Sequence, residues 1–139
     1  MERAKAVFAD SLKRSAADGL VERFYELFLA ASPEVAEKFA STDFGKQRQA
    51  LRSSLFLLML ADVEGSPGQA LLARLAESHG RKGLDIRPEL YEIWLDCLCL
   101  AVEDTDPQYD DEVEQAWRAV MQPGIDTMVA RYRSESEGA

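Results

Sequence analysis

The sequence has 139 residues, of which 47% are hydrophobic and 29% are charged, and its formal net charge is −9. This length and composition predict one folded domain and exclude a chain that stays disordered. The acidic charge argues against a nucleic-acid partner, because proteins that bind phosphate backbones concentrate Lys and Arg on their surface.

Apolar residues recur at spacings of three and four along most of the chain, which predicts an all-α fold class. A first helix is expected over residues 3–17 and is interrupted by the Asp-Gly pair at 18–19. The second helix follows that pair and ends at Ser32. Because proline is favoured at the first position of a helix, Pro33 is expected to open a short third helix over residues 33–39.

The fourth and fifth helices are each expected to bury a leucine-rich face. The fourth begins after an N-cap offered by the pair Thr42 and Asp43 and stops at the Gly- and Pro-containing residues 65–68. Its most apolar run, residues 55–61, is too short to cross a bilayer, so no membrane partner is expected. The fifth helix carries His79, the chain's only histidine, on the same face as several leucines and ends at the glycines that follow.

The sixth helix is expected to open at Pro88 and to close at residues 104–107. The last helix begins near Asp110 and contains Pro123. Since a proline in a helix interior removes one backbone hydrogen bond, we expect a kink or a short break there. The polar tail, residues 134–139, is expected to be frayed or disordered.

Two further observations concern the cysteines and the N-terminus. Cys97 and Cys99 are two residues apart on a predicted helix and therefore point to different faces, so we interpret them as buried free thiols. Residues 1–5 lack the basic and apolar regions of a secretory signal, and we expect a cytoplasmic protein. Taken alone, a histidine on an apolar face is more often a core residue than a ligand.

Five short motifs follow one another along nearly the whole chain: residues 33–39 after Tyr25, residues 47–51, the set Leu72, Leu75, Ala76 and His79, residues 88–91, and the pair Ala116 and Trp117. Together they resemble the globin family, and in particular single-domain bacterial globins and the haem domain of flavohaemoglobins. The resemblance implies a single globin domain over residues 1–139, with about seven to eight helices around a haem pocket.

The resemblance also implies a site for haem b. His79 would be the axial ligand to the iron, and Tyr25 and Gln47 would donate hydrogen bonds to dioxygen, nitric oxide or carbon monoxide on the opposite side. The residues expected to contact the cofactor are Phe39, Gln47, Leu51, Leu75, His79, Ile86, Tyr91 and Trp94. Since the sequence contains no C-x-x-C-H motif, the haem would be held non-covalently.

The sequence departs from flavohaemoglobins on the side of His79. Tyr91 matches a tyrosine that lies near the proximal histidine in that family, but the place of the accompanying glutamate falls at Tyr132. The loop before Pro88 is also two residues longer than expected. A peroxidase-like electronic push is therefore disfavoured, and a main-chain carbonyl near Leu75 is an alternative partner for the His79 ring.

Arg81 and Lys82 are two basic residues that follow His79. Two interpretations are open for them: they pair with haem propionates, or they form an exposed basic cluster.

The leading interpretation is reversible binding of dioxygen, with conversion of nitric oxide to nitrate if an external reductase supplies electrons. No Gly-rich dinucleotide fingerprint is present, so we expect that reductase to be a separate protein. The alternatives are a gas or redox sensor, or a haem-free regulatory module of globin shape, and peroxidase activity ranks lowest. The sequence leaves both a monomer and a homodimer open.

Overall fold

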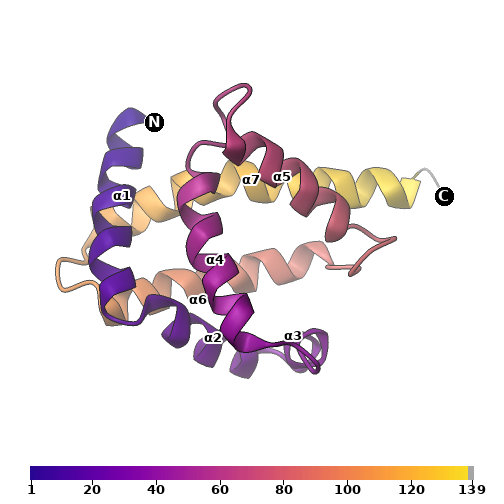
Figure 1. Cartoon of the computed structure of the whole chain (residues 1–139), viewed down its shortest axis with the longest axis horizontal. Helices are drawn as coiled ribbons and strands as arrows, with labels where there is room; N and C mark the ends of the chain where they lie inside the picture. The colour runs from indigo at the N-terminus through magenta and orange to yellow at the C-terminus, as the bar shows by residue number, and fades with distance from the viewer. Residues whose placement is uncertain (138–139) are drawn as a thin grey trace.

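The computed structural model describes residues 1–137, and this part of the chain contains seven α-helices and no strand (Figure 1). The helices are α1 (Glu2–Ala17), α2 (Leu20–Ala31), α3 (Pro33–Lys38), α4 (Phe44–Leu58), α5 (Pro67–Ser78), α6 (Pro88–Thr105) and α7 (Asp111–Glu137). The predicted all-α class is confirmed. Within the described residues, no helix combines the length and apolar character that a membrane span needs.

Local capping signals explain where most of these helices begin. The side chain of Ser32 accepts a hydrogen bond from the backbone N–H of Glu34, with Pro33 at the first helical position of α3. Ser66 caps α5 in the same way, 3.0 Å from the backbone nitrogen of Gln69. These side chains satisfy N–H groups that have no partner within the helix, which fixes the starts of α3 and α5.

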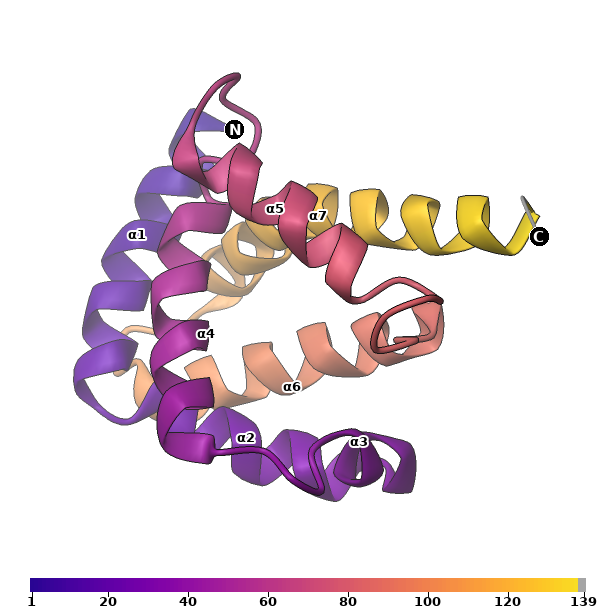
Figure 2. The same cartoon turned by 45° about the vertical axis from the view of Figure 1, so that its right-hand side comes forward.

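The helices pack as two main pairs. The α2 helix lies along α6, and α1 lies against α7, so that segments from the two ends of the chain meet. Figure 2 shows α4 at the front, with α5 to the right of its upper end and α3 to the right of its lower end. The core is rich in aromatic and leucine side chains, and its largest fully buried members are Trp117, Phe8, Phe24, Leu20, Leu55 and Leu98. As expected, Cys97 and Cys99 are buried free thiols.

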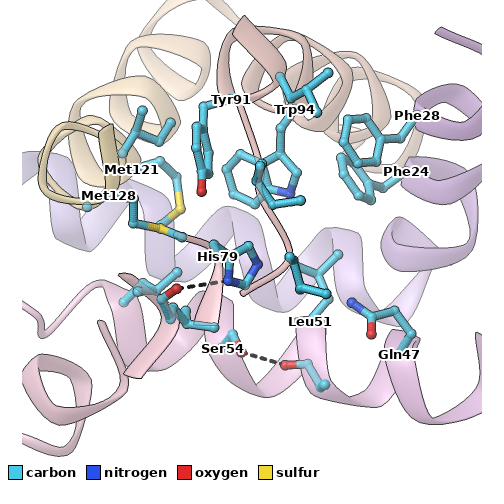
Figure 3. Close-up of a pocket in the computed structure, with 18 of the residues that line it drawn as sticks. Phe24, Phe28, Gln47, Leu51, Ser54, His79, Tyr91, Trp94, Met121 and Met128 are labelled. Atoms are coloured by element: carbon cyan, nitrogen blue, oxygen red, sulfur yellow. Dashed lines mark hydrogen bonds between the residues drawn. The ribbon is translucent and has the colours of Figure 1, made fainter. Parts of the chain in front are cut away.

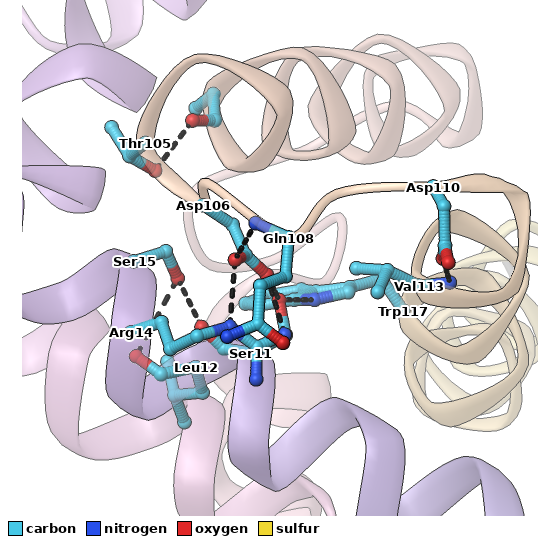
Figure 4. A network of polar contacts seen from close by, with 11 residues as sticks. Ser11, Leu12, Arg14, Ser15, Thr105, Asp106, Gln108, Asp110, Val113 and Trp117 are labelled. Carbon is cyan, nitrogen blue, oxygen red and sulfur yellow. Dashed lines mark hydrogen bonds and ion pairs between the residues drawn. The ribbon is translucent and has the colours of Figure 1, made fainter.

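A buried polar network joins α1 to the connection between α6 and α7 (Figure 4). Ser11 donates to the carboxylate of Asp106 at 2.6 Å, and Arg14 forms an ion pair with the same carboxylate at 2.7 Å. The indole N–H of Trp117 donates to Ser11 at 2.9 Å. Because the Asp106 carboxylate has several partners, its burial is compensated.

Two expectations from the sequence concern the last helix. A kink or a short break was predicted at Pro123, and the break is wrong, because α7 continues through this residue as one helix and packs against several other helices. Residues 134–137, part of the tail expected to be frayed or disordered, belong to α7. The side chain of Glu135 accepts a hydrogen bond from the backbone of Arg81. Residues 138–139 lie outside the described residues.

Candidate functional site

A pocket of about 420 Å³ lies between the two helical pairs, and six helices and two loops contribute to its wall. The pocket is lined by all nine residues that were expected to contact the cofactor or the gas: Tyr25, Phe39, Gln47, Leu51, Leu75, His79, Ile86, Tyr91 and Trp94. They come from segments far apart in the sequence. Figure 3 shows how the labelled members of this set converge on one space.

His79 stands at the C-cap of α5, and its ring reaches into the pocket (Figure 3). The ring nitrogen Nδ1 lies 2.9 Å from the main-chain oxygen of Leu75 and 3.1 Å from the hydroxyl oxygen of Ser78. Because a carbonyl oxygen can only accept a hydrogen bond, Nδ1 must carry the proton. The sequence-based alternative, donation to a carbonyl near Leu75, is confirmed.

This hydrogen bond determines what the other ring nitrogen can do. Burial lowers the pKa of His79, against the smaller opposing effect of the Leu75 hydrogen bond, so the ring is neutral at pH 7. A neutral imidazole that is protonated on Nδ1 carries a free electron pair on Nε2. The structure therefore offers Nε2 of His79 as a metal ligand, with the ring orientation fixed by the Leu75 carbonyl.

Tyr25 and Gln47 form a hydrogen-bonded pair elsewhere on the pocket wall. The amide Nε2 of Gln47, on α4, donates to the hydroxyl oxygen of Tyr25, on α2, at 3.1 Å. Burial raises the pKa of Tyr25, so the phenol keeps its proton. Since Gln47 donates to its oxygen, the Tyr25 hydroxyl can use its own hydrogen to donate to a second partner in the pocket.

Aromatic side chains form much of the remaining wall. The ring of Phe39 lies 5.7 Å from that of Tyr25, and the rings of Trp94 and Phe24 are 5.9 Å apart, both pairs in edge-to-face geometry. Tyr91 and Trp94 project from α6 toward His79 in Figure 3. Burial raises the pKa of Tyr91, so its hydroxyl is also neutral. The pocket therefore offers apolar surface with a small number of polar groups.

Several wall residues were not predicted from the sequence. Met121 and Met128, on α7, line the pocket on either side of Pro123, and their spacing of seven places them on one helix face. Treating Pro123 as a break hid this pattern. Ser54 also lines the pocket, although its hydroxyl donates to the Ala50 carbonyl at 2.7 Å.

Lys38 is a cation that lines the pocket, a position that was not predicted from the sequence. Its Nζ donates to the main-chain oxygen of Leu84 at 2.9 Å. Arg81 and Lys82 were the two basic residues that the sequence offered as partners for haem propionates. Arg81 places its guanidinium 5.0 Å from the centre of the Tyr132 ring, and Lys82 is exposed. Neither is among the residues lining the pocket, which favours the exposed basic cluster over a propionate contact.

The donor set fits a cofactor that carries most of its own metal ligands. Among residues 1–137, no three His, Cys, Asp or Glu side chains gather in a group that could hold a metal ion. One imidazole nitrogen with a free electron pair lies in a largely apolar pocket instead. Iron in a porphyrin needs one axial protein ligand and an apolar surrounding, so the residues present fit a haem.

Comparisons with known proteins agree with this geometry. The sequence model of the family described as Globin matches residues 22–128. The chain is also similar to a Pseudomonas aeruginosa protein whose crystal structure is described as structurally highly homologous to a human hemoglobin. Identity is 40%, the TM-score is 0.87, and the match covers 93% of this chain and 98% of that one. A comparison with curated proteins gives no match. The chain belongs to the globin family.

Proposed function

We propose that this globin binds one haem b non-covalently through Nε2 of His79 and holds dioxygen and other diatomic gases reversibly in the same pocket. Globins typically bind haem and, through it, diatomic gases. The observation that supports the assignment for this chain is the shared pocket. It joins a neutral imidazole with a free electron pair to a protonated tyrosine whose orientation Gln47 fixes.

Each residue in this proposal has a separate task. Haem iron with one imidazole ligand keeps one coordination position open for a diatomic gas. Tyr25 donates a hydrogen bond toward a gas molecule in the pocket, and Gln47 holds the phenol in place. Leu51 and Phe39 keep water away from this region, which strengthens the hydrogen bond. We therefore expect slow release of dioxygen.

The decisive experiment is an absorption spectrum of the purified protein in its ferric, ferrous and carbon monoxide forms, repeated for His79→Ala. We expect a Soret band in the native protein and its loss or displacement in the variant, since no other histidine exists in the chain. An identical spectrum for His79→Ala would remove His79 from the proposal. No Soret band in the native protein after haem is supplied would instead favour the haem-free regulatory module.

A reaction consistent with the same residues is the dioxygenation of nitric oxide. One molecule of nitric oxide, one of dioxygen and one electron give one nitrate ion, and an external reductase must supply the electron. Tyr25 and Gln47 provide the polar contacts that would hold dioxygen for this reaction. Nitrate formed per nitric oxide consumed, measured with a chemical reductant and a flavoprotein reductase in turn, tests the assignment. Consumption without nitrate would contradict it.

A further inference from the structure

We propose that Tyr132 and Glu135, near the end of α7, are positioning residues that hold the loop after His79 and thereby fix the direction of the imidazole. This inference rests on the proposed function, because it gives His79 the role of axial ligand. Figure 2 shows the connection from α5 to α6 lying between the end of α7 and α3. Neither residue lines the pocket, so each would act through the loop.

His79 depends on this loop because it is the C-cap of α5 and not an interior helix residue. Its backbone nitrogen still donates to the Leu75 carbonyl at 2.9 Å, but its carbonyl accepts from Ile86, across the loop, at 3.0 Å. A second loop bond joins Leu84 to the Ser78 carbonyl at 2.9 Å. The backbone on the C-terminal side of His79 is therefore held by the loop fold.

Tyr132 holds the loop at its most strained point. Asp85 has a φ of 53°, in the left-handed region that residues other than glycine seldom adopt. The hydroxyl of Tyr132 donates to the Asp85 carboxylate at 2.7 Å, and the Arg81 guanidinium covers the face of the same tyrosine ring. The hydrogen bond from α7 thus stabilises the turn that returns the chain toward Ile86.

Glu135 holds the beginning of the loop. Its side chain is only 13% exposed and accepts a hydrogen bond from the backbone N–H of Arg81 at 2.7 Å. Arg131, one turn earlier, forms an ion pair with it at 3.0 Å. A Cβ on Gly80 would come within 2.5 Å of the Glu135 carboxylate, so the glycine next to His79 permits this close approach.

The loop is also held from the opposite side. Lys38 donates to the Leu84 carbonyl, and Arg87 forms an ion pair with Glu34 on α3. The contacts from α3 reach the later part of the loop. Those from α7 reach Asp85 and Arg81, and Arg81 is only two positions after His79. The orientation of His79 should therefore depend more on α7 than on α3.

The test compares Tyr132→Phe with Tyr109→Phe. Tyr109 also donates its hydroxyl to a carboxylate, that of Glu114, but it does not line the pocket and serves as the matched control. One readout is the iron–histidine stretching band of the ferrous haem protein in resonance Raman spectra. The other is the exchange rate of the Nδ1 proton of the single histidine, measured by nitrogen-15 NMR in the carbon monoxide form or, if the chain carries no haem, in the protein as purified.

We expect Tyr132→Phe to shift or split the Raman band and to speed proton exchange at Nδ1 about tenfold, while Tyr109→Phe changes neither. Glu135→Gln should act in the same direction as Tyr132→Phe. Unchanged band and exchange rate in both α7 variants would overturn the proposal. Failure to bind haem would refute the proposed function, whereas the exchange measurement would still decide the positioning role.

A second pair of variants guards against the loss of the fold. Asp85→Gly removes the carboxylate at a φ that glycine adopts freely, so the chain should remain folded while the contact is lost. Asp85→Asn retains a carbonyl oxygen that can accept from Tyr132, and asparagine tolerates the left-handed region. We expect the first to behave like Tyr132→Phe and the second like the native protein. Identical spectra and exchange rates for both variants would contradict the proposal.

Discussion

Replacing Tyr25 with phenylalanine removes one hydroxyl group from the proposed gas pocket and leaves the aromatic ring in place. The ring packs against Phe24, Phe39 and Phe44 at centroid distances of 5.0–5.7 Å, and these contacts should persist in the variant. Gln47 loses its acceptor but is only half-buried, so its amide can turn to water. The substitution should therefore change ligand release much more than folding.

The magnitude follows from the single hydrogen bond that the hydroxyl can donate. A hydrogen bond to a charged or strongly polarised acceptor contributes about 1.5–3 kcal/mol. Each 1.4 kcal/mol corresponds to about a tenfold change in an equilibrium constant, and such changes in ligand binding are mostly changes in dissociation. We therefore expect dioxygen to leave Tyr25→Phe about 10- to 150-fold faster than it leaves the native protein.

The assay is stopped-flow displacement of dioxygen by carbon monoxide, followed at the Soret band. Tyr109→Phe, which removes a hydroxyl that lies outside the pocket, is the control and should leave the rate unchanged. Gln47→Leu should give a smaller increase than Tyr25→Phe, because the phenol would keep its proton and lose only its orientation. An unchanged dissociation rate for Tyr25→Phe, with normal haem content, would refute the role assigned to this hydroxyl.

Three further outcomes are expected from the structure. Asp106→Ala should lower the free energy of unfolding in urea by about 1–3 kcal/mol, because it leaves the buried Ser11 hydroxyl without its acceptor, whereas the Arg14 guanidinium can turn to water. Burial alone would raise the pKa of Asp106, but the hydrogen bonds to its carboxylate lower the pKa below its ordinary value. The stability that the Asp106 carboxylate contributes is therefore present above about pH 4 and is lost as the pH falls through the folded-state pKa. Asp106→Asn should make the free energy of unfolding less dependent on pH in this acid range. Gly68→Ala should destabilise the folded protein by about 2 kcal/mol or more, since the new Cβ would lie 2.0 Å from a backbone oxygen of α4. The Cβ of Gly124→Ala meets only an ordinary 3.6 Å contact, so this control should be neutral or stabilising. Thermal melts of the two variants measure the difference. Burial raises the pKa of Cys99 to about 11, so iodoacetamide at pH 8 should label this thiol far more slowly in the native protein than in urea.

Much of the helical framework could be predicted because its boundaries depend on neighbouring residues. Pro33 and Pro88 stand at the first positions of α3 and α6, and Asp43 caps α4. These signals act within a few residues and are therefore visible in the sequence. The positions of the pocket residues came from the resemblance to globins, since periodicity alone places His79 on an apolar face without saying what it faces.

The features that were missed depend on contacts between distant segments. A proline costs a helix one hydrogen bond, but packing of α7 against α1 and α5 outweighs that loss. The polar tail is helical where Glu135 meets the backbone of Arg81, a contact across 54 positions. Lys38 reaches the pocket because its Nζ bonds to the carbonyl of Leu84, which no local pattern indicates.

The pairing of α1 with α7 has a consequence for how the chain is made. Phe8 lies 4.5 Å from the ring of Trp117, and the indole of Trp117 is fully buried. During synthesis the first helix leaves the ribosome long before its partner exists, so this part of the core can close only after the first half of α7 has been made. Contacts between residues so far apart in sequence carry a loop-closure cost, and Trp117 fluorescence would report when α1 and α7 pair.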